Sequence, residues 1–88
     1  MSDFIKDPDA VLDYSVDWTA WLDTDTISSS GWSSPEGLTV VDTTFVATSA
    51  TVWLSGGTVG HRYRITNHIV TAAGRENDRT ISIRVQEE

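Results

Sequence analysis

The chain contains no cysteine among its 88 residues, so no disulfide can hold the fold together. A domain of this length buries only about 60% of the surface that its unfolded chain exposes, which leaves it marginally stable by itself. Small domains compensate with disulfides, a bound metal or subunit contacts. With the first device excluded, the sequence points to a metal or to assembly. The lack of cysteine also agrees with synthesis in a reducing cytoplasm.

Long apolar runs and basic residues are scarce as well. No apolar run approaches the roughly 18 residues that span a bilayer, and the stretch from Met1 to Lys6 lacks the apolar centre of a signal peptide. We therefore expect no membrane partner. Only 6 Lys and Arg stand against 13 Asp and Glu, a net charge of -7. A general nucleic-acid binder needs a basic footprint, so we expect no nucleic-acid partner either.

The charge is unevenly distributed along the chain. Residues 1–42 hold nine acids and one Lys, a net charge of -8, whereas residues 43–88 hold five Arg and four acids, a net charge of +1. Such a division is balanced within one fold when acidic strands lie beside basic ones, or between copies stacked head to tail. The sequence leaves both arrangements open.

What the chain has in abundance is β-branched residues. Its Thr, Val and Ile number 27, against 17 for Ala, Leu, Met, Gln, Lys and Glu together. Branched side chains lose rotamer freedom in a helix but pack well on a pleated sheet. We therefore predict a single all-β domain.

Alternation of apolar and polar residues locates the strands. It is strictest from Leu12 to Trp18, where the outer face is acidic, and it returns near the end, with Ile83 and Val85 inward and Ser82 and Arg84 outward. The predicted strands are 12–18, 26–32, 38–46 (one strand, or two broken near Asp42), 50–54, 63–69 and 79–85, with turns at 19–25, 33–37, 47–50 and 72–78. Residues 1–8 are predicted to form an N-terminal arm or edge segment, 9–86 the domain, and 87–88 a C-terminal tail.

The stretch from Leu54 to Tyr63 carries the prediction of the fold. A strand ends at Leu54, a glycine-rich turn containing Gly57 follows, and Tyr63 enters the next strand. Immunoglobulin-like and fibronectin-type sandwiches place a Tyr at such a corner, and its hydroxyl bonds back to the backbone upstream. We predict an immunoglobulin-like β-sandwich of six to seven short antiparallel strands, with Tyr63, Leu54 and Gly57 as its corner; a small barrel is the alternative.

No residues are grouped as a nucleophile with a base and an orienting partner, so we predict that the protein is not an enzyme. The histidines, His61 and His68, are interpreted as solvated surface residues. Two pairs of aspartates, Asp7 with Asp9 and Asp23 with Asp25, offer oxygen ligands for calcium, but neither belongs to a complete loop motif. We interpret them as a solvated acidic face and assign no metal and no cofactor.

Candidate interface residues come from the outward positions of the strands. Trp18 falls on an inward face, whereas Trp53 falls opposite Val52 and Leu54 and is predicted to be exposed. Exposed Trp is enriched at protein interfaces, although it also serves as cover for a sheet. Outward arginines form a predicted basic patch, balanced either by an acidic partner or by carboxylates of the same chain at Asp13 and Asp17 or at Glu76 and Asp78. The interface candidates are Trp53, Arg62, Arg64, Arg84, Asp13 and Asp17.

The sequence resembles a family of small tailed-bacteriophage virion proteins described as fiber-tail adaptor proteins. The matching segments are KDPDAVLDYSVDW (6–18), WL (21–22), DTI (25–27), GLTV (37–40), ATVWLSGGTVG (50–60), YRITN (63–67), TAAGREND (71–78) and RTISIRV (79–85). The resemblance implies a non-enzymatic structural role in a virion, after synthesis in the bacterial host cytoplasm. The implied partners are tail, connector or fiber components. The uneven charge of the two halves suggests copies of the chain itself as further partners. A capsid decoration protein and a carbohydrate-binding module that uses surface Trp remain alternatives.

Overall fold

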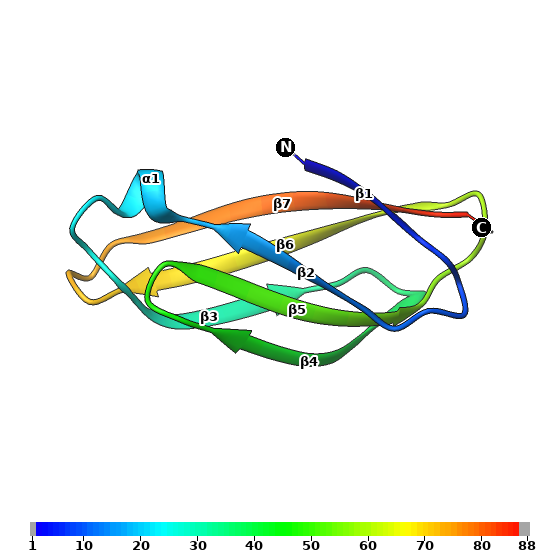
Figure 1. Ribbon diagram of the computed structural model, residues 1–88, viewed down its shortest axis with the longest axis horizontal. Coiled ribbons are helices and arrows are strands. Elements are labelled where there is room, and N and C mark those ends of the chain that lie inside the picture. Colours follow the sequence, from blue (N-terminus) through cyan, green and yellow to red (C-terminus); the bar gives the residue numbers. More distant parts are fainter. Residues whose placement is uncertain (1, 87–88) are drawn as a thin grey trace.

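The computed structural model describes residues 2–86, which form seven strands and one single-turn helix (Figure 1). The predicted tail at 87–88 lies outside the described residues. In chain order the elements are β1 (Ser2–Lys6), β2 (Leu12–Asp17), α1 (Thr19–Leu22), β3 (Ile27–Ser33), β4 (Leu38–Phe45), β5 (Ser49–Gly56), β6 (Arg62–Thr71) and β7 (Glu76–Val85).

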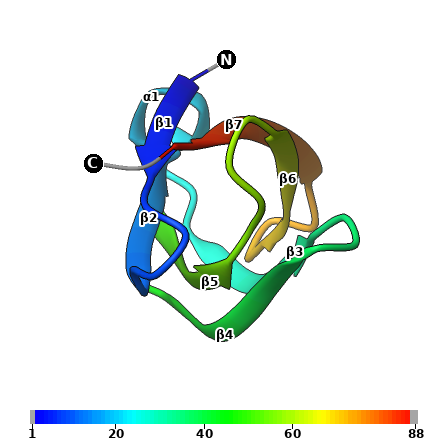
Figure 2. The same ribbon diagram turned by 90° about the vertical axis from the view of Figure 1, so that its right-hand side faces the viewer.

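The strands divide into a four-stranded sheet, in the order β1-β7-β6-β3, and a three-stranded sheet, in the order β2-β5-β4. Seen end-on, the two sheets face each other across one interior (Figure 2). The molecule is elongated along the strands and measures 41 × 21 × 18 Å. The predicted sandwich is therefore confirmed over the barrel. The pairing is antiparallel except between β1 and β7, which run parallel.

The core lies between the sheets and is built from the inward positions of the alternating strands. The four-stranded sheet contributes Ile65 and Ile83, and the three-stranded sheet contributes Val52 and Leu54; all four side chains are fully buried. Each buried side chain of this kind stabilises the fold by about 1.5–3 kcal/mol relative to an exposed one. Alternation with a period of two thus fixes which face of every strand is covered.

Three turns differ in detail from the prediction. The turn predicted at 19–25 contains the helix α1, whose Leu22 backbone N–H donates to the Trp18 carbonyl at 2.9 Å. Strand β7 begins at Glu76 and β5 at Ser49, earlier than predicted. The hairpin between β6 and β7 continues almost to its turn because backbone pairing, which polar residues make as well as apolar ones, extends to Val70 opposite Glu76. The predicted long strand around 38–46 is the single strand β4, with a shift in register between Val40 and Asp42.

Residues 2–6 form an edge strand of the sandwich, one of the two alternatives predicted for residues 1–8. Strand β1 is the edge strand beside β7, and Lys6 pairs with Val85. The Lys6 side chain is fully buried, and its ammonium donates to the carbonyls of Asp7 and Gly56, each at 2.8 Å. Burial lowers the pKa of Lys6, opposed by the charges of Asp7 and Asp9. The burial of Lys6 was not visible in the sequence, because backbone carbonyls rather than an acidic side chain accept its hydrogen bonds.

Ser82, expected to face solvent, is buried. It points away from the core but lies between β6 and β1, in register with Arg64 on one side. A short side chain on a strand that is paired on both sides is shielded from water even on an outer face.

The corner lies where the sequence placed it. The Tyr63 hydroxyl accepts a hydrogen bond of 2.9 Å from the Thr58 backbone N–H, and Leu54 is fully buried at the end of β5. Gly57 has a φ of 98° and no room for a side chain, because an added Cβ would lie 2.6 Å from Cγ2 of Val85. The tyrosine ring thus closes the crossover between the two sheets.

Candidate assembly surfaces

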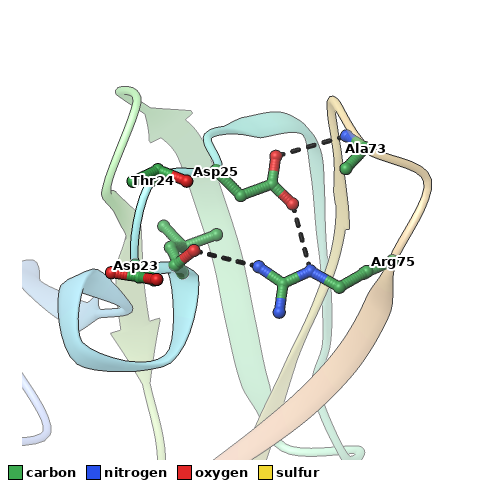
Figure 3. Close-up of a pocket in the computed structure, with 6 residues that line it drawn as sticks. Asp23, Thr24, Asp25, Ala73 and Arg75 are labelled. Atoms are coloured by element: carbon green, nitrogen blue, oxygen red, sulfur yellow. Dashed lines mark hydrogen bonds and ion pairs between the residues drawn. The ribbon is translucent and has the colours of Figure 1, made fainter.

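At one end of the sandwich an ion pair joins the α1 region to the β6–β7 hairpin. Arg75 Nε donates to Asp25 Oδ2 at 3.1 Å, and an Arg75 amino group donates to the Leu22 carbonyl at 3.0 Å (Figure 3). The other Asp25 oxygen accepts from the Ala73 backbone N–H. A hydrogen bond from Thr71, followed by those from Thr26, Arg75 and Ala73, outweighs desolvation and lowers the pKa of Asp25 to about 2. The Asp25 carboxylate therefore links the α1 region to the β6–β7 hairpin.

Two arginines at the same end stack on tryptophans. The Arg75 guanidinium lies 4.4 Å from the Trp21 ring centroid, and that of Arg79 lies 4.3 Å from the Trp18 ring. Arg79 also donates to the Asp17 carbonyl oxygen at 3.0 Å. Hydrogen bonds from the Thr19 side chain and backbone lower the pKa of Asp17, with a smaller contribution from Arg79. Two of the five arginines are thus used inside the chain.

His68 lies between two carboxylates on the outer face of the β6–β7 hairpin. Its Nδ1 contacts Asp78 Oδ1, and its Nε2 lies 3.0 Å from Glu76 Oε1. These hydrogen bonds, that of Asp78 first, raise the pKa of His68. The acids Glu76 and Asp78, which the sequence offered as partners for the basic patch, are therefore engaged by a histidine.

The outer face of the three-stranded sheet carries an exposed indole between two carboxylates. Trp53 of β5 is 38% exposed and lies in register with Asp13 of β2 on one side and Asp42 of β4 on the other. Residues in register share one face of a sheet, so the three side chains form a row across the strands, here called the acidic row. Strands β2, β4 and β5 contain no Lys or Arg. Asp13 therefore has no basic residue in the strands of its own sheet, whereas Asp17 lies near Arg79 of the other sheet.

One end of the outer face of the four-stranded sheet carries the opposite charge, away from the carboxylates that contact His68. Arg62 of β6 lies in register with Arg84 of β7, which lies in register with Ile5 of β1; these three residues are here called the basic row. Arg64 follows two residues farther along β6. Among the side chains that the structure describes, those of residues 4–86, none forms a hydrogen bond or ion pair with Arg62, Arg64 or Arg84. The structure thus separates the interface candidates onto two opposite faces.

A small cavity of about 240 Å³ opens beside the basic row. Its lining is apolar on one side and cationic on the other: Phe4, Ile5, Arg62, Ser82 and Arg84. Pockets for small-molecule ligands span about 300–1,000 Å³, so this cavity is sized for a single side chain.

Sequence reasoning missed Asp42 as a member of the acidic row. Plain alternation along β4 places Asp42 on the same face as Val40, whose partner Leu54 is buried, and the register shift between the two residues moves Asp42 opposite Trp53. The pairing of Arg75 with Asp25 was missed too, because 50 residues separate them. The interruption near Asp42 was the available signal for the bulge.

In the described part of the chain no three His, Cys, Asp or Glu residues are placed to hold a metal ion. Among the same residues, no helix is long and apolar enough to cross a membrane.

Comparison with known proteins decides the family. The family model described as "Podophage GP4 fiber-tail adaptor protein gp77" matches residues 6–84. The chain belongs to this family of phage fiber-tail adaptors. The resemblance predicted from the sequence motifs is thereby confirmed, and a family of phage structural adaptors implies a place in the virion and contacts with other tail or fiber proteins.

Comparison of the folds gives the architecture. The solution structure of the PKD domain from KIAA 1837 protein matches with a TM-score of 0.60 and 22% sequence identity, over 99% of this chain and 80% of that one. The similarity shows the fold alone, and it confirms the immunoglobulin-like sandwich. No curated protein sequence matches the chain.

Proposed function

We propose that this adaptor joins tail and fiber components of the virion by protein–protein contacts alone, without catalysis, after synthesis in the host cytoplasm. The observation that carries the proposal is the match of the fiber-tail adaptor family over residues 6–84. The surfaces support it: the exposed Trp53 and the arginines of the basic row offer an aromatic anchor and charge to a partner.

The carbohydrate-binding alternative needs a platform of exposed aromatic rings. Of the four tryptophans, Trp18 is buried, Trp21 lies against Arg75, Trp32 is half-buried in β3, and Trp53 alone is exposed. A single indole between two carboxylates suits a cationic partner better than a sugar chain. We therefore favour the adaptor over the carbohydrate-binding module.

The test is a phage that lacks this gene, grown in a host that supplies the wild-type chain from a plasmid or supplies nothing. Without the chain we expect particles with filled heads but no attached fibers in electron micrographs, and the plasmid should restore them. Particles that keep their fibers would contradict the proposal. Density lost from the shell instead would identify a capsid decoration protein.

Variants on the two faces refine the test. Trp53→Ala and the double change Arg62→Glu with Arg64→Glu should leave the fold intact, because these side chains point away from the core. Both should reduce fiber attachment when supplied from the plasmid. A circular-dichroism spectrum and a melting curve of each purified variant serve as the control for folding.

A further inference from the structure

We propose that the acidic row of one copy docks on the basic row of a second copy, so that the adaptor self-associates face to back. The inference rests on the proposed function, because it assigns part of the contact surface of a virion adaptor. The acidic row is Asp13, Trp53 and Asp42, and the basic row is Ile5, Arg84 and Arg62.

The two rows match in width and composition, with the apolar residue in the middle of the acidic row and at the β1 end of the basic row. Each crosses three adjacent strands, which are spaced about 4.8 Å apart, and each combines an exposed apolar side chain with two like charges. Trp53 is 38% exposed and Ile5 is 50% exposed. The charges have opposite signs, so one row is complementary to the other in charge and in width.

The basic row is unfavourable by itself. Arg62 and Arg84 lie directly opposite each other on paired strands, and like charges in that position destabilise a sheet. The acids of the hairpin do not relieve them, because Glu76 and Asp78 bond to His68. Carboxylates from another molecule placed against the two guanidinium groups would remove the repulsion and form charge-assisted hydrogen bonds.

Trp53 of the acidic row also finds a matching surface beside the basic row. The cavity of about 240 Å³ beside the basic row is lined by Phe4 and Ile5 on its apolar side and by Arg62 and Arg84 on the other. An indole from a second copy meets apolar surface there and guanidinium groups that stack on aromatic faces. The flanking Asp13 and Asp42 would then lie within reach of the arginines.

The two rows occupy opposite faces of the sandwich, since the three-stranded and four-stranded sheets cover the same core from opposite sides (Figure 2). Docking one row on the other therefore joins unlike surfaces. Such a heterologous contact leaves a free acidic row at one end of the stack and a free basic row at the other, and it continues into a ring or a filament.

The experiment is sedimentation equilibrium of the purified chain at loading concentrations of about 10 µM to about 1 mM, in low salt because surface charges are screened within about 10 Å at 0.1 M salt. We expect the wild-type mass to rise with concentration beyond a dimer and to fall when salt is added. A wild-type chain that stays monomeric over this range overturns the inference.

Two neutral double variants give the decisive comparison. Asp13→Asn with Asp42→Asn disables the acidic row, and Arg62→Gln with Arg84→Gln disables the basic row. Each variant alone should remain monomeric, and an equimolar mixture should form a 1:1 pair and nothing larger, because only one competent contact remains. Persistent self-association of either variant, or a mixture that stays monomeric, overturns the inference.

A change of net charge cannot explain a loss of self-association in the variant Asp13→Asn with Asp42→Asn. The chain carries a net charge of -7, so neutralising two carboxylates reduces general repulsion and should promote association, the opposite of the predicted effect. The matched control is Asp23→Asn with Glu36→Gln, an equal change of charge at two exposed residues outside both rows, which should associate at least as strongly as wild type.

The outcome separates this inference from the proposed function. A monomeric chain that still restores fibers to particles overturns self-association and leaves the adaptor role intact. A second outcome is a monomeric chain that restores fibers only when Asp13 and Asp42 are intact. That outcome also overturns docking on a second copy, and it assigns the acidic row to an arginine-bearing surface of another virion protein.

Discussion

The indole Nε1 of Trp18 donates a hydrogen bond of 2.9 Å to Oδ1 of Asn67, and both residues are fully buried. Trp18 follows β2 of the three-stranded sheet, and Asn67 lies in β6 of the four-stranded sheet, so the bond crosses the core. The Asn67 amide in turn donates to Ser30 Oγ and to the Gly31 carbonyl of β3. One side chain thus satisfies polar groups from both layers, which a buried polar group requires.

Removal of this amide should destabilise the sandwich. Asn67→Ala leaves the buried indole N–H without an acceptor and opens a cavity, and we expect a loss of about 2–4 kcal/mol in the free energy of unfolding. Urea denaturation followed by tryptophan fluorescence measures it. Asn77→Ala is the matched control, because Asn77 is half-buried on β7 and accepts one local hydrogen bond from the Asp78 N–H. Equal effects of the two substitutions would contradict the bridging role.

Acid should weaken the hydrogen bonds and the ion pair of the Asp25 carboxylate. The pKa of Asp25 is lowered from 3.8 to about 2, chiefly by hydrogen bonds led by that from Thr71. A lowered pKa in the folded state means that the stabilisation is complete above the unfolded value and is lost as the pH falls from about 4 towards 2. In Asp25→Asn this part of the acid-induced loss should disappear, and Thr71→Val should diminish it. The measurement is urea denaturation at about pH 7, 4, 3 and 2, which brackets the pKa of Asp25 in the folded and in the unfolded state. An unchanged profile in Asp25→Asn would refute this assignment.

His68 should titrate in the opposite sense. Hydrogen bonds to Asp78 and then to Glu76 raise the pKa of His68 above 6.5. The stabilisation is therefore complete below the unfolded value and is lost as the pH rises through the raised value in the folded state. An NMR titration of the imidazole should give a midpoint above 6.5 in the wild type and a lower midpoint in Asp78→Asn. An unchanged midpoint in Asp78→Asn would show that Asp78 does not stabilise the imidazolium of His68.

Sequence pattern predicted those features of the fold that depend on neighbours along the chain. Alternation along the predicted strand 63–69 puts Tyr63, Ile65, Asn67 and Ile69 on one face, and all four are buried. The indole that completes the Asn67 network lies 49 residues away, and nothing in a local pattern marks such a pairing. The same limit applies to Arg75 with Asp25, whose partnership depends on how the sheets are stacked.

The candidate surfaces were predictable in part for a related reason. The exposed position of Trp53 followed from alternation in β5, and the outward arginines followed from that in β6 and β7. Which strands lie side by side is a property of the topology, so the acidic neighbours of Trp53 and the apolar neighbour Ile5 of Arg84 required the strand order. The buried Lys6 was hidden because its cost is met by backbone carbonyls rather than by an acid.

The tyrosine corner should be sensitive to its glycine for two separable reasons. Gly57 has a φ of 98°, and an added Cβ would lie 2.6 Å from Cγ2 of Val85 and 3.5 Å from Cε2 of Tyr63. Gly57→Ala therefore combines backbone strain of about 1–2 kcal/mol with overpacking of about 1–3 kcal/mol.

Gly74→Ala isolates the first contribution, because Gly74 has a φ of 86° and an added Cβ there meets no atom within 4 Å. In urea denaturation we expect Gly57→Ala to lose about 2–5 kcal/mol and Gly74→Ala about 1–2 kcal/mol. The difference measures how tightly Val85 and Tyr63 close the corner around the backbone. If the two variants lose the same stability, the close packing of Gly57 against Val85 contributes nothing, and the corner is held by the Tyr63 hydroxyl and its bond to Thr58 alone.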